Sequence, residues 1–100
     1  MYFVYITASK KNGILYIGFS GSLPVRVYQH KTGEIEGFTS RYNVKRLVYY
    51  EGYADPSDGI QREKQLKKWK RAWKIRLIEK HNPKWIDLYD DGEIIALPRE

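Results

Sequence analysis

The sequence predicts a single α/β (α+β) domain, because three strand-like runs and two helical segments share a chain of 100 residues. Runs rich in β-branched and aromatic residues, as is typical of strands, lie at positions 2–7, 14–17 and 46–51. Residues 23–31 and 59–80 carry the start signals and apolar spacing of helices. A chain of this length buries one modest core. We therefore expect one domain at residues 1–90 and a C-terminal tail at residues 91–100.

The first two strand-like runs are joined by a polar segment that ends in Asn12-Gly13, a strong turn dipeptide. They therefore predict a β-hairpin with a rather long loop. Because alternate residues of a strand share a face, Phe3 and Tyr5 are expected on the same side of the sheet. Tyr16 stands just before Gly18, where the chain can turn sharply.

The first helical segment follows this hairpin. Ser22 can cap its start, and Pro24 stands in its first turn, where a missing N–H group costs nothing. We expect the helix to stop before Gly33. Arg26 and His30 are four residues apart, so both side chains lie on one face of this helix.

The second helical segment is longer and starts at a cap formed by Ser57 or Asp58. Its apolar residues recur at helical intervals. They are Ile60, Leu66, Trp69, Trp73, Ile75, Leu77 and Ile78. We expect this stripe to face the sheet. The segment forms either one helix or two helices with a bend near residues 69–71, and Pro83 ends it.

Glu63 lies on the row of core-facing residues, between Ile60 and Leu66. Burying an unpaired carboxylate costs several kcal/mol. An inward Glu63 therefore needs a cation, which is either a metal ion or a nearby arginine. The alternative is that Glu63 reaches water at the edge of the stripe, or pairs with Lys67 one turn later.

The positive charge of the chain, +6 in total, is concentrated in one segment. Nine of the eighteen Lys and Arg residues fall between Arg62 and Lys80, where the acidic residues are Glu63 and Glu79. Such a basic stripe is typical of a protein that binds a polyanion, usually nucleic acid; a solvated helix face is the alternative. The candidate nucleic-acid contacts are Arg41, Lys67, Lys68, Lys70, Arg71 and Lys74.

Two further segments complete the chain. Residues 32–43 are polar and predict a loop, in which Arg41 can contact a phosphate and Tyr42 can stack on a base, or both can simply hold the loop in place. After the second helical segment, Trp85 and Leu88 are expected to pack back on the sheet.

Composition excludes several classes of protein. The chain has no cysteine and two histidines, so disulfide frameworks and Cys/His-rich zinc sites are excluded. It has no long apolar run for a membrane span, and its N-terminus lacks the pattern of a signal peptide. We therefore expect a cytoplasmic protein that does not bind membranes.

The hairpin and the first helix together resemble the GIY-YIG nuclease superfamily. Residues 3–5 (Phe-Val-Tyr) take the place of the G-I-Y strand, with Phe3 where the signature has glycine, and residues 16–18 match Y-I-G to the letter. The family carries an arginine on the following helix and a His or Tyr one turn later, which Arg26 and His30 match. The family's lysine near the Y-I-G glycine has no evident counterpart here, and Lys10, Lys11 and Lys31 are the alternatives.

The resemblance covers residues 1–90 and points to the small, stand-alone, single-domain branch, whose relatives include the incision domain of the excision-repair nuclease. It implies a small three-stranded sheet flanked by helices. It also implies a divalent-metal-dependent endonuclease that hydrolyses phosphodiester bonds in DNA with low sequence specificity and acts in DNA repair. The implied catalytic set is Tyr5, Tyr16, Arg26, His30 and Glu63.

Each of these residues has an implied role. Glu63 would be the single protein ligand of one Mg²⁺ or Mn²⁺ ion, and Arg26 would stabilise charge on the phosphoryl oxygens. Tyr5 is the preferred base, with Tyr16 as a positioning hydroxyl, and the reverse assignment stays open. A tyrosine needs nearby positive charge to act as a base at neutral pH, and Arg26, His30 and the metal would supply it. Whether Asn82 takes part is also open.

The implied partner is DNA, in duplex, branched or single-stranded form, with RNA as an open alternative. The chain has no separate DNA-recognition domain, so a protein partner would supply specificity. The alternative function is a non-catalytic, basic nucleic-acid-binding module on a nuclease-like scaffold. A protein–protein adaptor is a third interpretation, and it predicts no DNA binding even at low salt.

Overall fold

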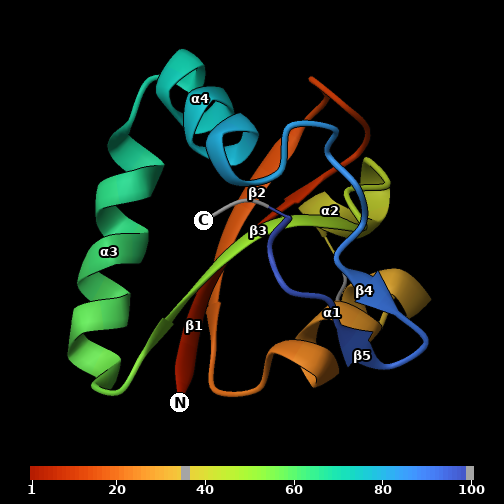
Figure 1. The fold of residues 1–100 in the computed structure, drawn as a ribbon. Helices are drawn as coiled ribbons and strands as arrows, with labels where there is room; N and C mark the ends of the chain where they lie inside the picture. Colours follow the sequence, from red (N-terminus) through yellow and green to blue (C-terminus); the bar gives the residue numbers. More distant parts are fainter. Residues whose placement is uncertain (35–36, 99–100) are drawn as a thin grey trace.

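The computed structural model describes residues 1–34 and 37–98 and contains a three-stranded antiparallel sheet with helices on both faces (Figure 1). The strands are β1 (Tyr2–Ala8), β2 (Leu15–Ser20) and β3 (Arg46–Tyr53), in the order β2–β1–β3. The helices are α1 (Leu23–Thr32), α2 (Phe38–Arg41), α3 (Pro56–Lys68) and α4 (Arg71–His81). The two short strands of a C-terminal ribbon are β4 (Tyr89–Asp90) and β5 (Glu93–Ile94). The predicted fold class is confirmed. No helix in the described ranges is both long and apolar enough to cross a membrane.

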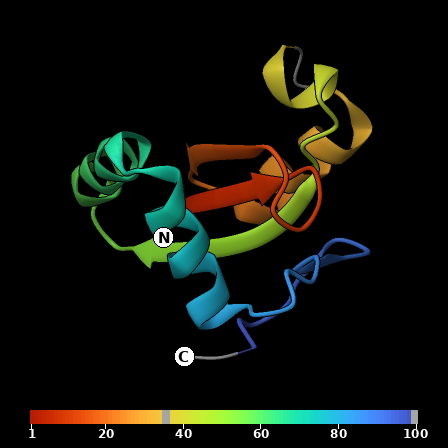
Figure 2. The same cartoon turned by 90° about the horizontal axis from the view of Figure 1, so that it is seen from above.

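The core forms two clusters, one on each face of the sheet beside the central strand β1. Figure 2 shows α3 and α4 (green to blue) on the left of the view and α1 and α2 (orange and yellow) on the right. Val4 and Ile6 pack on the face that α3 and α4 cover. Tyr5 points the other way and packs with residues of α1 and with Leu88. The predicted hairpin and its alternation are confirmed, and the register places Tyr5 opposite Gly18.

Helix α1 begins and ends as its sequence predicts, but its cap differs. Proline stands in its first turn, and Gly33 ends it in the left-handed conformation with φ 78°. The Ser22 side chain makes no capping hydrogen bond. Instead, the Ser20 hydroxyl accepts from the backbone N–H of Ser22 and donates to its carbonyl, which fixes the turn between β2 and α1.

The long helical segment divides into α3 and α4 because Trp69 and Lys70 adopt extended backbone angles. The two-helix alternative is thus confirmed, whereas the predicted cap is wrong: Asp55 caps α3 by accepting a 2.9 Å hydrogen bond from the N–H of Ser57. The prediction that the whole apolar stripe faces the sheet is wrong for two of its members, because Ile60 remains 39% exposed and Trp73 remains 45% exposed.

A carboxylate that accepts four hydrogen bonds fixes α3 to the sheet. Glu51 of β3 accepts hydrogen bonds from Nε and Nη2 of Arg62 at 2.9 and 3.0 Å, and also from the hydroxyls of Tyr49 and Tyr53. Burial raises the pKa of Glu51, but these donors outweigh it and hold the pKa below its ordinary value. Arg62, which belongs to the basic stripe in sequence, is therefore a structural cation.

The segment after α4 returns to the sheet as expected, since Trp85 and Leu88 are fully buried. Residues 91–98 fall in the part that the sequence assigns to a tail. There β5 pairs with β4, and the carbonyl of Ile95 accepts a hydrogen bond from the Tyr50 hydroxyl at 2.9 Å. Leu97 packs against the core. These long-range contacts have no signature in local composition.

Asn82 joins α4 to β3 from a fully buried position. Its Nδ2 donates to the carbonyls of Val48 and Ile86 at 3.0 and 2.9 Å, and its Oδ1 accepts from the N–H of Ile86 at 3.1 Å. Both polar atoms of the Asn82 side chain thus make hydrogen bonds that stabilise the fold.

We predict that Asn82→Ala lowers the free energy of unfolding by about 2–4 kcal/mol, because one buried and two part-buried backbone groups lose their partner. Urea unfolding measures this change. The exposed neighbour Lys84 provides a control, and Lys84→Ala should shift stability by no more than about 0.5 kcal/mol. Equal stabilities of the two variants would contradict this role of Asn82.

Candidate active site

Three aromatic side chains from three elements meet on the α1 face of the sheet. The ring of Tyr5 on β1 lies 6.4 Å from the ring of Tyr16 on β2 and 5.7 Å from that of His30 on α1, measured between centroids. The rings of Tyr16 and His30 are 5.5 Å apart. The hairpin register and the α1 face thus bring together residues that are up to 25 positions apart in sequence.

A buried chain of hydrogen bonds runs through this cluster. The Tyr5 hydroxyl lies 2.9 Å from Nε2 of His30, and Nδ1 of His30 lies 3.1 Å from Oγ1 of Thr39. Burial lowers the pKa of His30 to about 4, and the charge of Arg26 adds to the effect. The imidazole is therefore neutral at neutral pH, with one donor and one acceptor nitrogen. One of its two hydrogen bonds is thus donated by His30 and the other is accepted by it.

The neutral state of His30 corrects one expectation from the sequence. His30 was expected to supply positive charge near a catalytic tyrosine, but an imidazole held in a dry site loses its proton more readily than one in water. Thr39 was missed altogether. It belongs to α2, which the sequence predicts as a loop, and no local pattern marks a buried threonine that faces a histidine 9 residues away.

Tyr5 occupies an enclosed position, with only 1% of its surface exposed. Burial raises the pKa of its hydroxyl, Tyr16 and Glu63 add to the increase, and Arg26 opposes it. Tyr5 therefore stays protonated at neutral pH. The charges of Arg26 and Glu63 therefore both act on the Tyr5 hydroxyl, although Glu63 comes from a helix on the other face of the sheet.

Gly18 makes this arrangement sterically possible. A Cβ atom at this position would lie 2.4 Å from both Cζ and the hydroxyl oxygen of Tyr5, closer than any real contact. The ring of Tyr5 therefore lies directly over the backbone of the opposite strand. A sharp turn, which the sequence suggests for Gly18, is not the reason for glycine here, because Gly18 lies within β2.

Glu63 projects from α3 with 18% of its side chain exposed, and its Oε2 lies 3.2 Å from Nζ of Lys67. This is the i,i+4 pair that the sequence offers as one alternative. Among residues 1–34 and 37–98, no group of three or more His, Cys, Asp or Glu side chains could hold a metal ion. A single carboxylate suits a hard ion such as Mg²⁺, which keeps most of its water ligands, so the donor set of this site fits such an ion.

A hollow of about 290 Å³ opens beside Tyr16. Its walls come from β2, α2, α3 and α4, and its lining residues are Leu15, Tyr16, Ile17, Phe38, Lys67 and Lys74. Two lysines therefore flank the tyrosine. They come from the distant helices rather than from the sequence alternatives, of which Lys31 pairs with Asp87 and Lys10 and Lys11 are exposed.

The other candidate nucleic-acid contacts lie in different settings. Arg71 donates to the carbonyls of Asn12 and Gly13 at 2.7 and 2.6 Å, and so ties α4 to the hairpin loop. Lys68 and Lys70 are exposed at the α3–α4 junction. Arg41 is exposed on α2, where the rings of Phe38 and Tyr42 pair at 5.0 Å. Of the six candidates, Lys67 and Lys74 lie nearest to the tyrosine cluster, since both line the hollow with Tyr16.

A comparison with known families decides what this cluster belongs to. The model of the GIY-YIG catalytic domain matches residues 1–76, which include all five predicted catalytic positions. The chain belongs to the GIY-YIG family. The UPF0213 proteins of Staphylococcus aureus strains Mu3, Mu50 and N315 are each 35% identical to it over 78 residues, which are 78% of this chain and 94% of the relative. No solved structure matches the chain significantly.

Membership of the GIY-YIG family places the chain in a nuclease superfamily, which suggests a nuclease-type function with a nucleic-acid substrate. Nucleases of this family generally depend on a divalent metal ion. In this GIY-YIG domain, the two motif tyrosines are Tyr5 and Tyr16. The glycine of the Y-I-G motif is Gly18, and the Tyr5 ring lies over it.

We predict that Gly18→Ala displaces Tyr5 and destabilises the GIY-YIG domain by about 1–3 kcal/mol, because the added methyl group overpacks a closed site. Gly21→Ala is the matched control: its Cβ meets only the Tyr2 ring, at 3.7 Å. Thermal unfolding of both variants measures the difference. A Gly18→Ala domain as stable as the control would disprove the close approach.

We also predict a pH dependence from His30. Because its pKa is lowered to about 4 in the folded state, its neutral form contributes fully above pH ~6.5, and the contribution falls as pH decreases toward 4. The full loss is about 3 kcal/mol at 1.36 kcal/mol per pKa unit. NMR titration should show a neutral His30 ring down to pH ~5, and His30→Gln should flatten this part of the stability profile. A ring that titrates near 6.5 would contradict the prediction.

Proposed function

We propose that the protein is a cytoplasmic, divalent-metal-dependent endonuclease that hydrolyses phosphodiester bonds in DNA with little sequence preference. The observation that supports it most is the cluster of Tyr5, Tyr16 and His30, in which the charges of Arg26 and Glu63 shift the pKa of Tyr5. A role in DNA repair and a partner protein that supplies target specificity belong to the same proposal.

The scissile phosphate would enter through the hollow beside Tyr16. Lys67 and Lys74 line this hollow and attract the phosphodiester backbone. The charge of Arg26 opposes the burial that raises the pKa of Tyr5 and adds to the burial that lowers the pKa of His30, and is thus available to the same site. A guanidinium in such a position stabilises the charge that builds up on the phosphoryl oxygens.

The burial pattern supports Tyr16 rather than Tyr5 as the group that takes the proton from the attacking water. Tyr5 is enclosed, hydrogen-bonded to His30 and protonated at neutral pH. Tyr16 is half-buried and lines the open hollow, where water can reach its hydroxyl. Tyr5, held by His30 and Thr39, then acts as the positioning hydroxyl, which is the reverse of the assignment that the sequence favours.

Glu63 would hold the divalent ion, Mg²⁺ or Mn²⁺, which stabilises charge on the phosphate and on the leaving oxygen when bound. Lys67 does not block this role. Its side chain is 53% exposed, so its ammonium group can exchange the carboxylate for a substrate phosphate while it remains hydrated.

A non-catalytic nucleic-acid-binding module is the second candidate. The Glu63–Lys67 ion pair favours it, because a carboxylate with a lysine partner has no unmet need for a metal ion. Both functions predict salt-sensitive binding to nucleic acid. They differ in whether the wild-type protein nicks supercoiled plasmid in the presence of Mg²⁺.

We predict that Glu63→Gln lowers the Mg²⁺-dependent nicking rate by about 10²-fold or more, because the amide cannot hold a hard cation. DNA binding in EDTA should persist, and stability should change by no more than about 1 kcal/mol, since the lost i,i+4 pair joins Glu63 to a lysine whose side chain is 53% exposed. Asp58→Asn is the matched control, as it removes an exposed carboxylate from the same helix. Normal nicking by Glu63→Gln would reject the metal role. Binding without nicking by the wild-type protein would favour the second candidate.

The two tyrosines give a separate prediction. Tyr16→Phe should reduce nicking more than Tyr5→Phe does, because only the first removes a hydroxyl from the open hollow. Tyr5→Phe should instead remove the hydrogen bond to His30, worth about 1 kcal/mol of stability. Nicking rates and unfolding curves of both variants measure these effects. A larger rate loss in Tyr5→Phe would restore Tyr5 as the base.

A further inference from the structure

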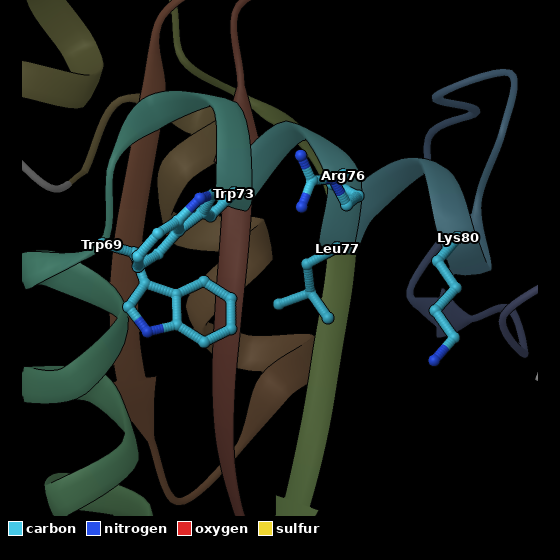
Figure 3. Close-up of a pocket in the computed structure, with 5 residues that line it drawn as sticks. All are labelled: Trp69, Trp73, Arg76, Leu77 and Lys80. Atoms are coloured by element: carbon cyan, nitrogen blue, oxygen red, sulfur yellow. The ribbon is translucent and has the colours of Figure 1, made fainter.

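A second concave surface lies on the α4 side of the sheet, on the face opposite α1. Its volume is about 360 Å³, and its lining residues are Trp69, Trp73, Arg76, Leu77 and Lys80. We call it the tryptophan groove. Figure 3 shows the two indoles side by side at one end, Arg76 and Leu77 along the middle and Lys80 at the other end, with the strands behind them. Neither the family motif nor the cluster at Tyr5 uses this surface.

The aromatic rings of the groove are held in place although one of them is exposed. Trp69 and Trp73 meet edge to face, with centroids 6.1 Å apart and planes at 84°. Cations lie against both rings: the guanidinium of Arg62 is 5.0 Å from Trp69, and Nζ of Lys70 is 5.8 Å from Trp73. An indole that stays exposed loses about 25 cal/mol of hydrophobic stabilisation for each Å² of apolar surface that remains in water. Rigid, exposed aromatic surface of this kind is typical of a binding site.

We propose that the tryptophan groove binds a single-stranded segment of nucleic acid, with a base stacked on Trp73 and phosphates beside Arg76 and Lys80. Stacking aromatics within a basic surface are how proteins bind single strands without reading sequence. The described lining residues include two cations and no acidic side chain, so the charge of the groove suits a polyanion. The proposal rests on the proposed function in taking nucleic acid as the substrate.

The chain itself connects the groove to the hollow beside Tyr16. Lys67 and Lys74 line the hollow, whereas Trp69 and Trp73 line the groove. Trp69 follows Lys67 by two positions and Trp73 directly precedes Lys74, so both pairs lie at the junction of α3 and α4. We infer that a strand whose phosphate occupies the hollow extends over this basic junction toward the groove. The protein would thus favour substrates with an unpaired strand next to the bond that is cut.

Two other occupants fit less well. A second copy of the chain would bring another net charge of +6 to a groove whose rim is already positive. An acidic peptide matches the charge, but it lacks the flat rings that would stack on a fixed indole. Both are outcomes of the experiment below.

The experiment measures binding of a twelve-nucleotide oligo(dT) in EDTA by quenching of tryptophan fluorescence. Trp85 is fully buried, so quenching reports on Trp69 and Trp73. We expect quenching in the wild-type protein and about tenfold weaker binding by Trp73→Ala, as is typical for the loss of one stacking ring. Trp73→Phe should retain most of the affinity. Affinity for a blunt duplex with the same number of phosphates should fall less than twofold in Trp73→Ala.

A charge-matched pair of variants provides an independent readout. Lys80→Gln should weaken oligo(dT) binding and flatten the slope of log K against log salt by about 0.7, the value for one contact to a single strand. Lys84→Gln removes the same charge from an exposed residue outside the groove and should leave the slope unchanged. This pair decides the matter if Trp73→Ala does not fold, as circular dichroism would show.

Oligo(dT) binding that is unaffected by Trp73→Ala, or equal slopes for Lys80→Gln and Lys84→Gln, would overturn the proposal. So would a dimer in sedimentation that Trp73→Ala abolishes, or quenching by a poly-glutamate peptide but not by oligo(dT). Because the assay contains no metal, it is independent of cleavage. If binding depends on Trp73 but the protein does not nick DNA, the groove proposal stands and the endonuclease proposal is rejected. If nicking is normal but binding does not depend on Trp73, the endonuclease proposal stands and the groove proposal is rejected.

Discussion

The hydrogen bond between Tyr5 and His30 is the constraint on which the candidate site depends. It joins the central strand β1 to α1 inside a dry region, at a distance of 2.9 Å. The bond forms because Gly18 leaves room for the Tyr5 ring over the neighbouring strand, and because Thr39 holds the far nitrogen of the imidazole. With α1 fixed in this way, Arg26 lies one turn before His30 on the same helix, and its charge opposes the burial that raises the pKa of Tyr5. A single buried contact thus sets both the polarity and the geometry of the cluster.

A second anchor positions the helix that carries the carboxylate. The pairing of Glu51 with Arg62 fixes α3 against β3, and the next residue, Glu63, carries a charge that contributes to the raised pKa of Tyr5. The basic stripe consequently divides into groups with different tasks. Arg62 and Arg71 hold elements together, Lys67 and Lys74 flank the hollow at Tyr16, and Arg76 and Lys80 border the tryptophan groove. Net charge alone could not separate these groups, because each depends on what lies opposite the side chain.

Much of the fold could be predicted from sequence because its signals are local. Strand alternation placed Tyr5 and Val4 on opposite faces, and the i,i+4 spacing of Arg26 and His30 placed both on one face of α1. The convergence of Tyr5, Tyr16 and His30 followed from these patterns and from the resemblance to the GIY-YIG family. The catalytic roles of these residues stay predictions. Errors arose where a local rule had more than one solution: Asp55 rather than Ser57 or Asp58 capped α3, and a two-residue extended break turned Trp73 outward.

The sequence by itself determined the order of the three sheet strands and of the two long helical segments, the hairpin with its two tyrosines and the helix with its arginine and histidine, because periodicity and turn residues act over a few neighbours. Only the tertiary structure decided the neutral state of His30, the raised pKa of Tyr5, the partner role of Thr39 and the docking of residues 91–98. These properties depend on desolvation and on hydrogen bonds between residues far apart in the chain. Burial is a property of the whole packed domain, and no short window of sequence contains it.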